Sequence, residues 1–133
     1  MQNTIDKFGP LVGRIMMAVI FLFSGFGKIA GFAGTAGYMA SKGLPMVEVL
    51  LVASIVIEIG GALMLILGYK AKLGAAALLL WMIPVTLVFH NFWAVPAAEQ
   101  QLQMIMFMKN LAMLGGLLYI MAFGSGPMSL ARR

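Results

Sequence analysis

The sequence contains no cysteine and a single histidine, His90. Without cysteine the chain cannot carry out disulfide exchange, ligate an iron–sulfur cluster through thiolates or attach haem covalently. One histidine cannot supply two axial histidine ligands to a haem within one chain. The sequence therefore predicts no metal site and no haem or iron–sulfur ligands of its own, and the cofactor is left unknown.

Charged residues are also scarce, at 10% of the chain against about 25% in ordinary soluble domains. The net charge of +5 is spread thinly and forms no basic block, which argues against nucleic acid as a partner. Hydrophobic residues make up 62% of the 133 residues, enough for about four membrane spans of ~20 residues each. The lipid bilayer is the partner that this composition predicts.

Four apolar windows predict spans at about 11–28, 47–67, 73–93 and 103–123. Backbone inside lipid must satisfy its own hydrogen bonds, and the windows lack the strict alternation of barrel strands, so helices are expected. The predicted fold is all-α, a four-helix integral membrane bundle forming one domain over 1–133. The first window could instead be a signal peptide, but Lys28 lies where a cleavage region should be neutral, so we expect it to stay.

The connections between the windows differ in kind. Residues 68–72 are so few that spans two and three should form an antiparallel hairpin. Between spans one and two, apolar residues recur at helical spacing before Gly43-Leu44-Pro45, a helix stop. We expect a short interfacial helix there, ended by Gly43 in the left-handed conformation.

The Lys and Arg residues predict the orientation in the membrane. The side of the bundle that holds the N-terminus collects six of the nine, namely Lys7, Arg14, Lys70, Lys72, Arg132 and Arg133. The opposite side has three, namely Lys28, Lys42 and Lys109. This count favours both termini in the cytoplasm.

The ionisable residues inside the windows whose positions matter most are Arg14, Glu58, His90 and Lys109, one on each predicted helix. Such a group costs about 2.5–3.5 kcal/mol at mid-membrane on insertion scales unless it is paired or hydrated. Small residues share each helical stripe with these groups, which lets helices approach closely, so the stripes should meet in a polar bundle core. His90 and Trp93 are expected on one stripe of the third helix.

Glu58 lies near the middle of its span and can reach a cation on either side. Arg14 is the expected partner because a guanidinium is always charged and forked, and Lys109 is the alternative. Arg14 could instead extend to the interface, and Glu58 could serve packing alone. The run from His90 to Trp93 could be an interfacial aromatic belt.

Several spaced motifs follow one another along the chain. They are Gly13-Arg14, Phe23-Ser24-Gly25-Phe26-Gly27-Lys28, Tyr38-Met39-Ala40, Glu58 with Gly60 and Gly61, His90-Asn91-Phe92-Trp93, Phe107-Met108-Lys109-Asn110-Leu111 and the closing Gly124-Ser125-Gly126-Pro127. In this order they resemble the DoxX family of small bacterial inner-membrane proteins. The resemblance implies a four-span protein of the cytoplasmic membrane, related to the membrane subunit of thiosulfate:quinone oxidoreductase. Family members often carry the label oxidoreductase.

Carried onto matching positions, the family's polar pattern falls on Arg14, Lys28, Glu58, His90, Trp93, Lys109 and Asn110. The leading hypothesis is a membrane oxidoreductase subunit that binds a quinone-like or phenolic molecule and works with a redox partner protein.

In this hypothesis Glu58 and His90 are the catalytic residues that move protons, and Trp93, Lys109 and Asn110 bind the ligand. Arg14 and Lys28 pair charges. A small-solute or proton conduit and a ligand-free scaffold are the alternatives. Catalysis by the chain alone and a homo-oligomer are left open.

Overall fold

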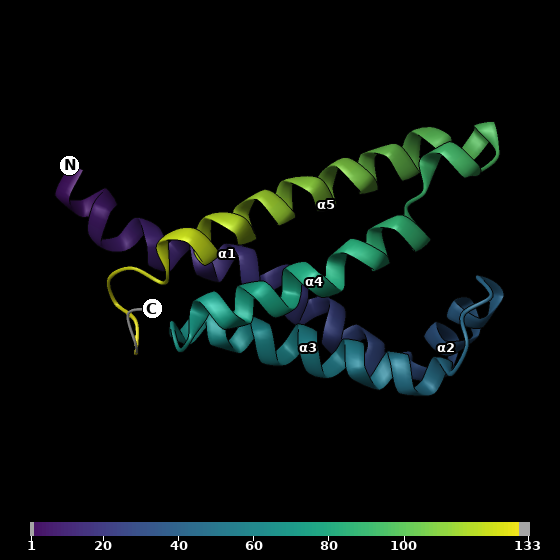
Figure 1. The fold of residues 1–133 in the computed structure, drawn as a ribbon, viewed down its shortest axis with the longest axis horizontal. Coiled ribbons are helices and arrows are strands. Elements are labelled where there is room, and N and C mark those ends of the chain that lie inside the picture. The colour runs from purple at the N-terminus through teal and green to yellow at the C-terminus, as the bar shows by residue number, and fades with distance from the viewer. Residues whose placement is uncertain (1, 131–133) are drawn as a thin grey trace.

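A computed structural model describes residues 2–130 of the chain, which fold almost entirely into helices (Figure 1). The elements in this part are α1 (Gln2–Ala30), α2 (Phe32–Ser41), α3 (Val47–Leu67), α4 (Ala71–Phe89), the short 3₁₀ helix η1 (Phe92–Ala94) and α5 (Ala97–Phe123). The all-α fold predicted from the sequence is confirmed.

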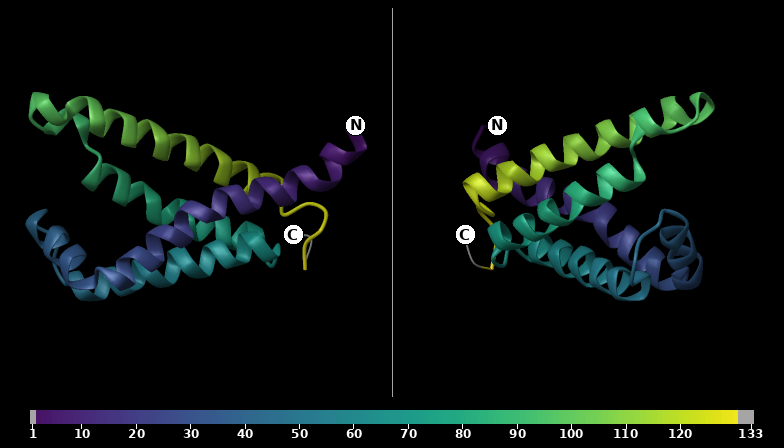
Figure 2. Two further views of the ribbon diagram at one scale, coloured as in Figure 1. Left: turned by 180° about the vertical axis from the view of Figure 1, so that it is seen from behind. Right: turned by 45° about the vertical axis from the view of Figure 1, so that its right-hand side comes forward.

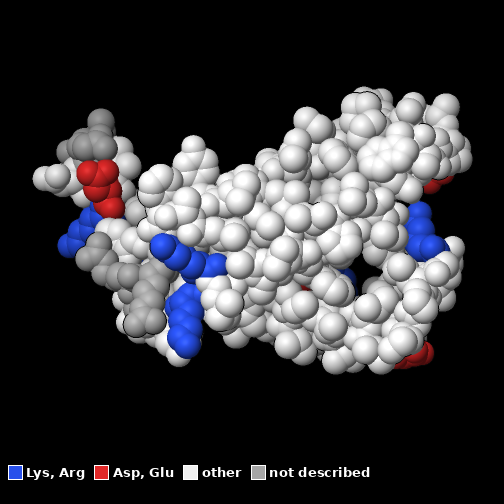
Figure 3. Space-filling model, in the orientation of Figure 1, with Lys and Arg blue, Asp and Glu red and all other residues white. Residues whose placement is uncertain are grey.

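Four of these helices are long and apolar enough to cross a membrane, over Asn3–Ala30, Val47–Leu67, Ala71–Ala94 and Ala97–Phe123. On the face shown in Figure 3, Lys, Arg, Asp and Glu side chains gather toward the two ends of the bundle, and the surface between them is almost free of charge. Exposed Leu, Ile, Val, Met and Phe side chains cover the described surface, as a bilayer requires. The chain is therefore a four-span integral membrane protein.

The long helices follow one another in space as an arc, α1 beside α3, α3 beside α4, and α4 beside α5 (Figure 2). We call the end that holds the N-terminus and the α3–α4 turn the termini end, and the opposite end the α2 end. At the termini end α1 also meets α5, where Met17 packs on Gly116. Toward the α2 end the α4–α5 pair diverges from α1 and α3 (Figures 1 and 2).

The α3–α4 hairpin closes within the few residues that the sequence predicted. Gly68 adopts φ 68°, and the N–H groups of Gly68 and Tyr69 donate to the carbonyls of Leu65 and Met64. These bonds satisfy carbonyls that the end of α3 would otherwise leave unpaired. Along the hairpin, Gly61 lies against the side chain of Leu78, so the two helices approach closely.

The short helix α2 lies between the first two spans, as expected. Its buried residues Ala36 and Met39 pack near Leu51 at the start of α3. Gly43 ends the segment with φ 80°, and its N–H donates to the carbonyl of Ala40 at 2.9 Å. A glycine is favoured here because this backbone conformation crowds any Cβ.

The third candidate span reaches Ala94, but the helix within it is interrupted. We expected one continuous helix through Trp93, whereas α4 ends at Phe89, and Asn91 has a non-helical backbone before η1 begins. The reason is tertiary: the Phe92 and Trp93 rings pack edge-on against Phe107 of α5, which holds the connection against that helix. His90 and Trp93 therefore do not share one helical stripe.

Candidate ligand-binding site

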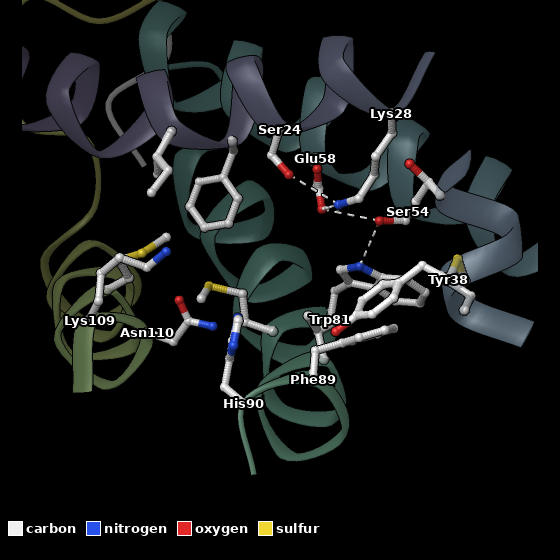
Figure 4. Close-up of a pocket in the computed structure, with 17 residues that line it drawn as sticks. Ser24, Lys28, Tyr38, Ser54, Glu58, Trp81, Phe89, His90, Lys109 and Asn110 are labelled. Atoms are coloured by element: carbon white, nitrogen blue, oxygen red, sulfur yellow. Dashed lines mark hydrogen bonds and ion pairs between the residues drawn. The ribbon is translucent and has the colours of Figure 1, made fainter. Parts of the chain in front are cut away.

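A cavity of about 310 Å³ lies toward the α2 end, between the diverging helices (Figure 4). Each of the five α-helices contributes to its wall. The lining residues used below are Phe21, Ser24, Lys28, Tyr38, Ser54, Glu58, Trp81, Val85, Phe89, His90, Lys109 and Asn110. The space-filling view shows a hollow at this end of the molecule, with a few charged atoms beside it (Figure 3). The cavity brings together residues from positions 20 to 113 of the chain.

The centre of the polar wall is an ion pair between Lys28 of α1 and Glu58 of α3. Glu58 is only 5% exposed. The Lys28 ammonium also donates to the Ser24 hydroxyl at 3.1 Å, one turn earlier on α1. The pair thus holds the two helices together with both charges compensated, which lowers the cost of burying them.

A second chain of hydrogen bonds reaches the same carboxylate from α4. The Trp81 indole Nε1 donates to the Ser54 hydroxyl at 3.1 Å, and Ser54 donates in turn to Glu58 Oε1 at 3.1 Å (Figure 4). Ser54 is one turn before Glu58 on α3, so the helix itself places the two side chains together. Protein donors therefore converge on Oε1, while Glu58 Oε2 is buried and has no partner among the described residues.

Aromatic side chains form much of the apolar wall, namely Phe21, Tyr38, Trp81 and Phe89. Tyr38 from α2 packs against Phe89 from α4, with ring centroids 5.5 Å apart. The two rings lie side by side in the close-up, one from α2 and one from α4 (Figure 4). Helix α2 therefore covers the cavity at the end of the bundle.

Two of the residues expected to bind a ligand, Asn110 and Lys109, line this cavity on the α4–α5 side, together with His90, which was expected to be catalytic. Asn110 is buried and donates to the Thr86 hydroxyl at 3.0 Å. His90 Nδ1 lies 2.9 Å from the Gln103 side-chain oxygen. Lys109 is exposed, and its ammonium lies 3.8 Å from the Met106 sulfur. His90, Lys109, Asn110, Lys28 and Glu58 thus share one cavity.

Trp93 lies outside this group, contrary to the sequence prediction. It is 56% exposed and packs in η1 with its rings against Phe92 and Phe107. It does not belong to the cavity wall. The physical reason is the early end of α4, which turns Trp93 away from the direction that a continuous helix would give it.

The expected pair between Arg14 and Glu58 is not formed either. Arg14 donates to the carbonyls of Leu65 and Ile66 at the end of α3, at 2.8 and 3.2 Å. It also donates to the carbonyls of Pro127 and Met128, at 3.3 and 3.0 Å. The carbonyls at the end of a helix lack intrahelical donors, so they can accept hydrogen bonds from a cation that lies at the same depth in the membrane. Glu58 pairs with Lys28 instead, a residue that was already expected to pair charges.

Sequence reasoning missed the aromatic wall. Trp81, Val85 and Phe89 recur four residues apart and share one face of α4, a signal that could have identified it. The contribution of Tyr38 depends on how α2 folds over the bundle, and no pattern in the sequence fixes that. Within residues 2–130 no three His, Asp or Glu side chains gather to hold a metal ion.

Comparison with known proteins addresses the resemblance directly. The model of the DoxX family matches residues 9–91. The chain belongs to the DoxX family. The matched part of this DoxX protein includes the Lys28–Glu58 pair and His90, whereas Lys109 and Asn110 lie beyond it.

Three relatives match most of this DoxX protein, and two of them are also covered over most of their own length. Inner membrane protein YphA of Escherichia coli K12 is 32% identical over 92% of this chain and 88% of its own. Inner membrane protein YqjF of the same strain is 34% identical over 98% of this chain and 95% of its own. A Surfeit locus protein 4 homolog of Schizosaccharomyces pombe is 26% identical over 96% of this chain and 38% of its own length. No solved structure is significantly similar.

Proposed function

We propose that this DoxX protein is a membrane oxidoreductase subunit that binds a quinone-like or phenolic molecule in the cavity at the α2 end. The single observation that carries the proposal is the composition of the cavity wall. Aromatic rings line the cavity beside the ion pair of Lys28 with the buried Glu58, and His90 and Asn110 lie across the cavity from the pair (Figure 4). Such a wall suits a flat ring with polar oxygens, since ligand sites are mostly apolar with a few placed polar groups.

The size and position of the cavity support a ring bound from the bilayer. Its volume of about 310 Å³ is at the small end of known ligand sites, enough for a ring system but not for a long apolar tail. Helices α1 and α5, which both line the cavity, meet only toward the termini end. A membrane-soluble quinone can enter between them and leave its tail among the lipids.

The residues suggest a division of roles. Glu58 accepts or returns the proton of a ring hydroxyl, and His90 does the same for the opposite oxygen. Lys109 and Asn110 orient the ring, and Lys28 holds the Glu58 charge in place. The chain has no cysteine and one histidine, so we propose that electrons are exchanged with a redox partner protein.

We place the protein in the inner membrane of a bacterium, where its relatives YphA and YqjF are named as residents. From the count of Lys and Arg residues on each side, we further propose that both termini lie in the cytoplasm. The cavity then lies in the outer half of the bundle. Arg132 and Arg133, which contribute to this count, lie outside the described residues.

A conduit for protons or small solutes is the less favoured function. Along α1, Ala18 and Phe21 separate Arg14 from Lys28, and along α3, Ala62 and Leu65 follow Glu58. These four residues belong to one buried apolar cluster. The polar cavity therefore ends against packed side chains rather than continuing toward the termini end, which favours a binding site.

Filling the cavity tests the proposal. We expect Val85→Trp to abolish binding of a short-chain quinone to the protein in lipid nanodiscs, because Val85 lines the cavity. Leu87→Trp is the matched control, since Leu87 is two residues away on α4 and half-exposed on the lipid side. Loss of binding in the first variant alone supports the proposal. Quinone binding that survives Val85→Trp, or no binding by the parent protein, overturns it.

A further inference from the structure

We propose that the molecule bound in the cavity is an anion, a phenolic ring that carries a carboxylate, and that this group pairs with the ammonium of Lys109. The inference rests on the proposed function, because it assumes that the cavity binds a ring of this class. It goes further by assigning the charge of the ligand and the residue that recognises it.

The position of Lys109 in the apolar part of α5 is the first observation. About 9 Å of helix separate Lys109 from Gln103, the last polar side chain before it. Residues 111–123, which complete the same helix, carry no charge. An ammonium inside such a segment is costly unless it is paired or hydrated. Lys109 therefore needs a counter-ion at its own depth.

The acidic side chains of the chain do not supply this counter-ion. Three of the four lie near the beginnings of helices, namely Asp6, Glu48 and Glu99. The fourth, Glu58, lies within α3 and pairs with Lys28. Within residues 2–130 the Lys109 ammonium contacts the uncharged Met106 sulfur, at 3.8 Å, and forms no ion pair. The missing negative charge has to come from another molecule.

The cavity gives that molecule access to Lys109. The side chain is exposed, lines the cavity and extends toward it from α5 (Figure 4). An occupant of the cavity can therefore touch the ammonium without any rearrangement of the bundle.

The two sides of the cavity differ in charge, which favours an anion over other ligands. On the α1–α3 side the Lys28 ammonium balances the Glu58 carboxylate. On the α4–α5 side Lys109 has no such balance, and His90 is neutral or positive but never negative. A carboxylate beside Lys109 removes the imbalance. A neutral carbonyl leaves it in place, and an ammonium ligand would add to it.

Three compounds that share one shape but differ in charge test the inference. The probes are 6-hydroxy-2-naphthoate, which is anionic, its neutral amide and its cationic amidine. Equilibrium dialysis against the protein in nanodiscs of zwitterionic lipid, with empty nanodiscs subtracted, gives each affinity. We expect the carboxylate to bind at least tenfold more tightly than the amide, a difference of ~1.4 kcal/mol, and the amidine to bind most weakly.

Substitution of Lys109 identifies the group that recognises the charge. Lys109→Met should abolish the preference for the carboxylate over the amide, whereas Lys109→Arg, which keeps the charge, should retain it. Lys42→Met is the matched control, because Lys42 is an exposed cation at the α2 end that does not line the cavity. A preference that persists in Lys109→Met, or equal losses of affinity for both compounds, overturns the role of Lys109.

The outcomes with the parent protein separate this inference from the proposed function, and they need no variant. Equal affinity for carboxylate and amide, or tighter binding of the amide, overturns the anionic ligand but leaves the cavity as a ring-binding site. If none of the three compounds binds while a short-chain quinone does, the inference alone is overturned. If the quinone also fails to bind, the proposed function is overturned with it.

Discussion

The Arg14 guanidinium donates a 2.8 Å hydrogen bond to the main-chain carbonyl of Leu65, 51 residues along the chain. Arg14 is 2% exposed and lies in the first span, whereas Leu65 is in the last turn of α3. Further bonds from the same guanidinium to Pro127 and Met128 bring the segment after α5 to the same place. A single side chain thus joins α1, the end of α3 and the C-terminal segment.

Replacing Arg14 should therefore weaken the whole bundle. We expect Arg14→Gln to lower the free energy of unfolding by about 2–4 kcal/mol, because several carbonyls lose a charged donor. The free energy of unfolding of Arg14→Lys should lie between those of the parent protein and Arg14→Gln, since an ammonium keeps the charge but not the planar fork. Unfolding in mixed micelles followed by circular dichroism measures this. Lys72→Gln removes an exposed cation at the same end and should leave stability unchanged. An unchanged Arg14→Gln would contradict this account.

Replacing Glu58 tests how much its ion pair with Lys28, near the other end of α1, contributes to stability. Glu58→Leu leaves the Lys28 ammonium without its partner and should cost about 1–3 kcal/mol, less than in a dry core because Lys28 is partly exposed. Adding Lys28→Met should restore part of this loss, since the unpaired charge is removed. A double-mutant cycle of unfolding free energies measures the coupling. Glu48→Leu, at the exposed start of α3, is the control, and additive effects at Glu58 and Lys28 would argue against the pair.

Ligand affinity should depend on residues that line the cavity and not on Trp93. The double variant His90→Ala/Lys109→Ala should weaken binding of a quinone analogue tenfold or more, ~1.4 kcal/mol. Trp93→Ala should bind like the parent, because Trp93 packs on Phe92 and Phe107 instead. Equilibrium dialysis of the same analogue compares the three proteins. If Trp93→Ala weakened binding and the double variant did not, the site predicted from the sequence, with Trp93 at its edge, would be the better description.

Orientation in the membrane can be tested by labelling introduced cysteines, since the chain has none of its own. Ser41 and Gln100 are exposed at the α2 end, and Lys72 is exposed at the termini end. In intact cells we expect an impermeant maleimide to label Ser41→Cys and Gln100→Cys, and Lys72→Cys only after the membrane is permeabilised. The reverse pattern would invert the proposed topology.

Two adjacent glycines of α3 offer a test of helix packing. A Cβ at Gly61 would lie 2.7 Å from Leu78 Cγ, whereas a Cβ at Gly60 has no neighbour within 4 Å. Gly61→Ala should therefore destabilise the α3–α4 hairpin by about 1–3 kcal/mol through overpacking. Gly60→Ala should be neutral or stabilising by up to ~1 kcal/mol, because alanine favours the helix. Similar melting temperatures for the two variants would contradict the close approach at Gly61.

The fold could be predicted from local signals because a bilayer leaves the chain few choices. Apolar length sets the spans, and Gly43 adopts the left-handed backbone that was expected of a helix stop. The end of α4 could not be predicted in this way. It depends on contacts of Phe92 and Trp93 with Phe107 on another helix, and hydropathy carries no information about such contacts.

The sequence predicted which residues belong to the candidate site better than it predicted which of them pair with one another. Helical periodicity predicted that Glu58 faces the bundle interior, where the structure also places it. Its partner could not be derived from depth and charge, because these ignore the main-chain carbonyls that hold Arg14. Lys28 has a flexible side chain, which lets its ammonium contact Ser24 one turn earlier on α1 and Glu58 on α3. A helical wheel does not describe this flexibility.

The bonds from Arg14 to Pro127 and Met128 also set an order for biosynthesis. During translation α1 enters the membrane long before residues 127 and 128 leave the ribosome, so Arg14 spends that interval without two of its acceptors. The bundle reaches its final cohesion only when this segment docks, with the Leu130 amide bonded to the Leu67 carbonyl. Nascent chains stalled before residue 127 should therefore be more sensitive to membrane proteases than chains released after it.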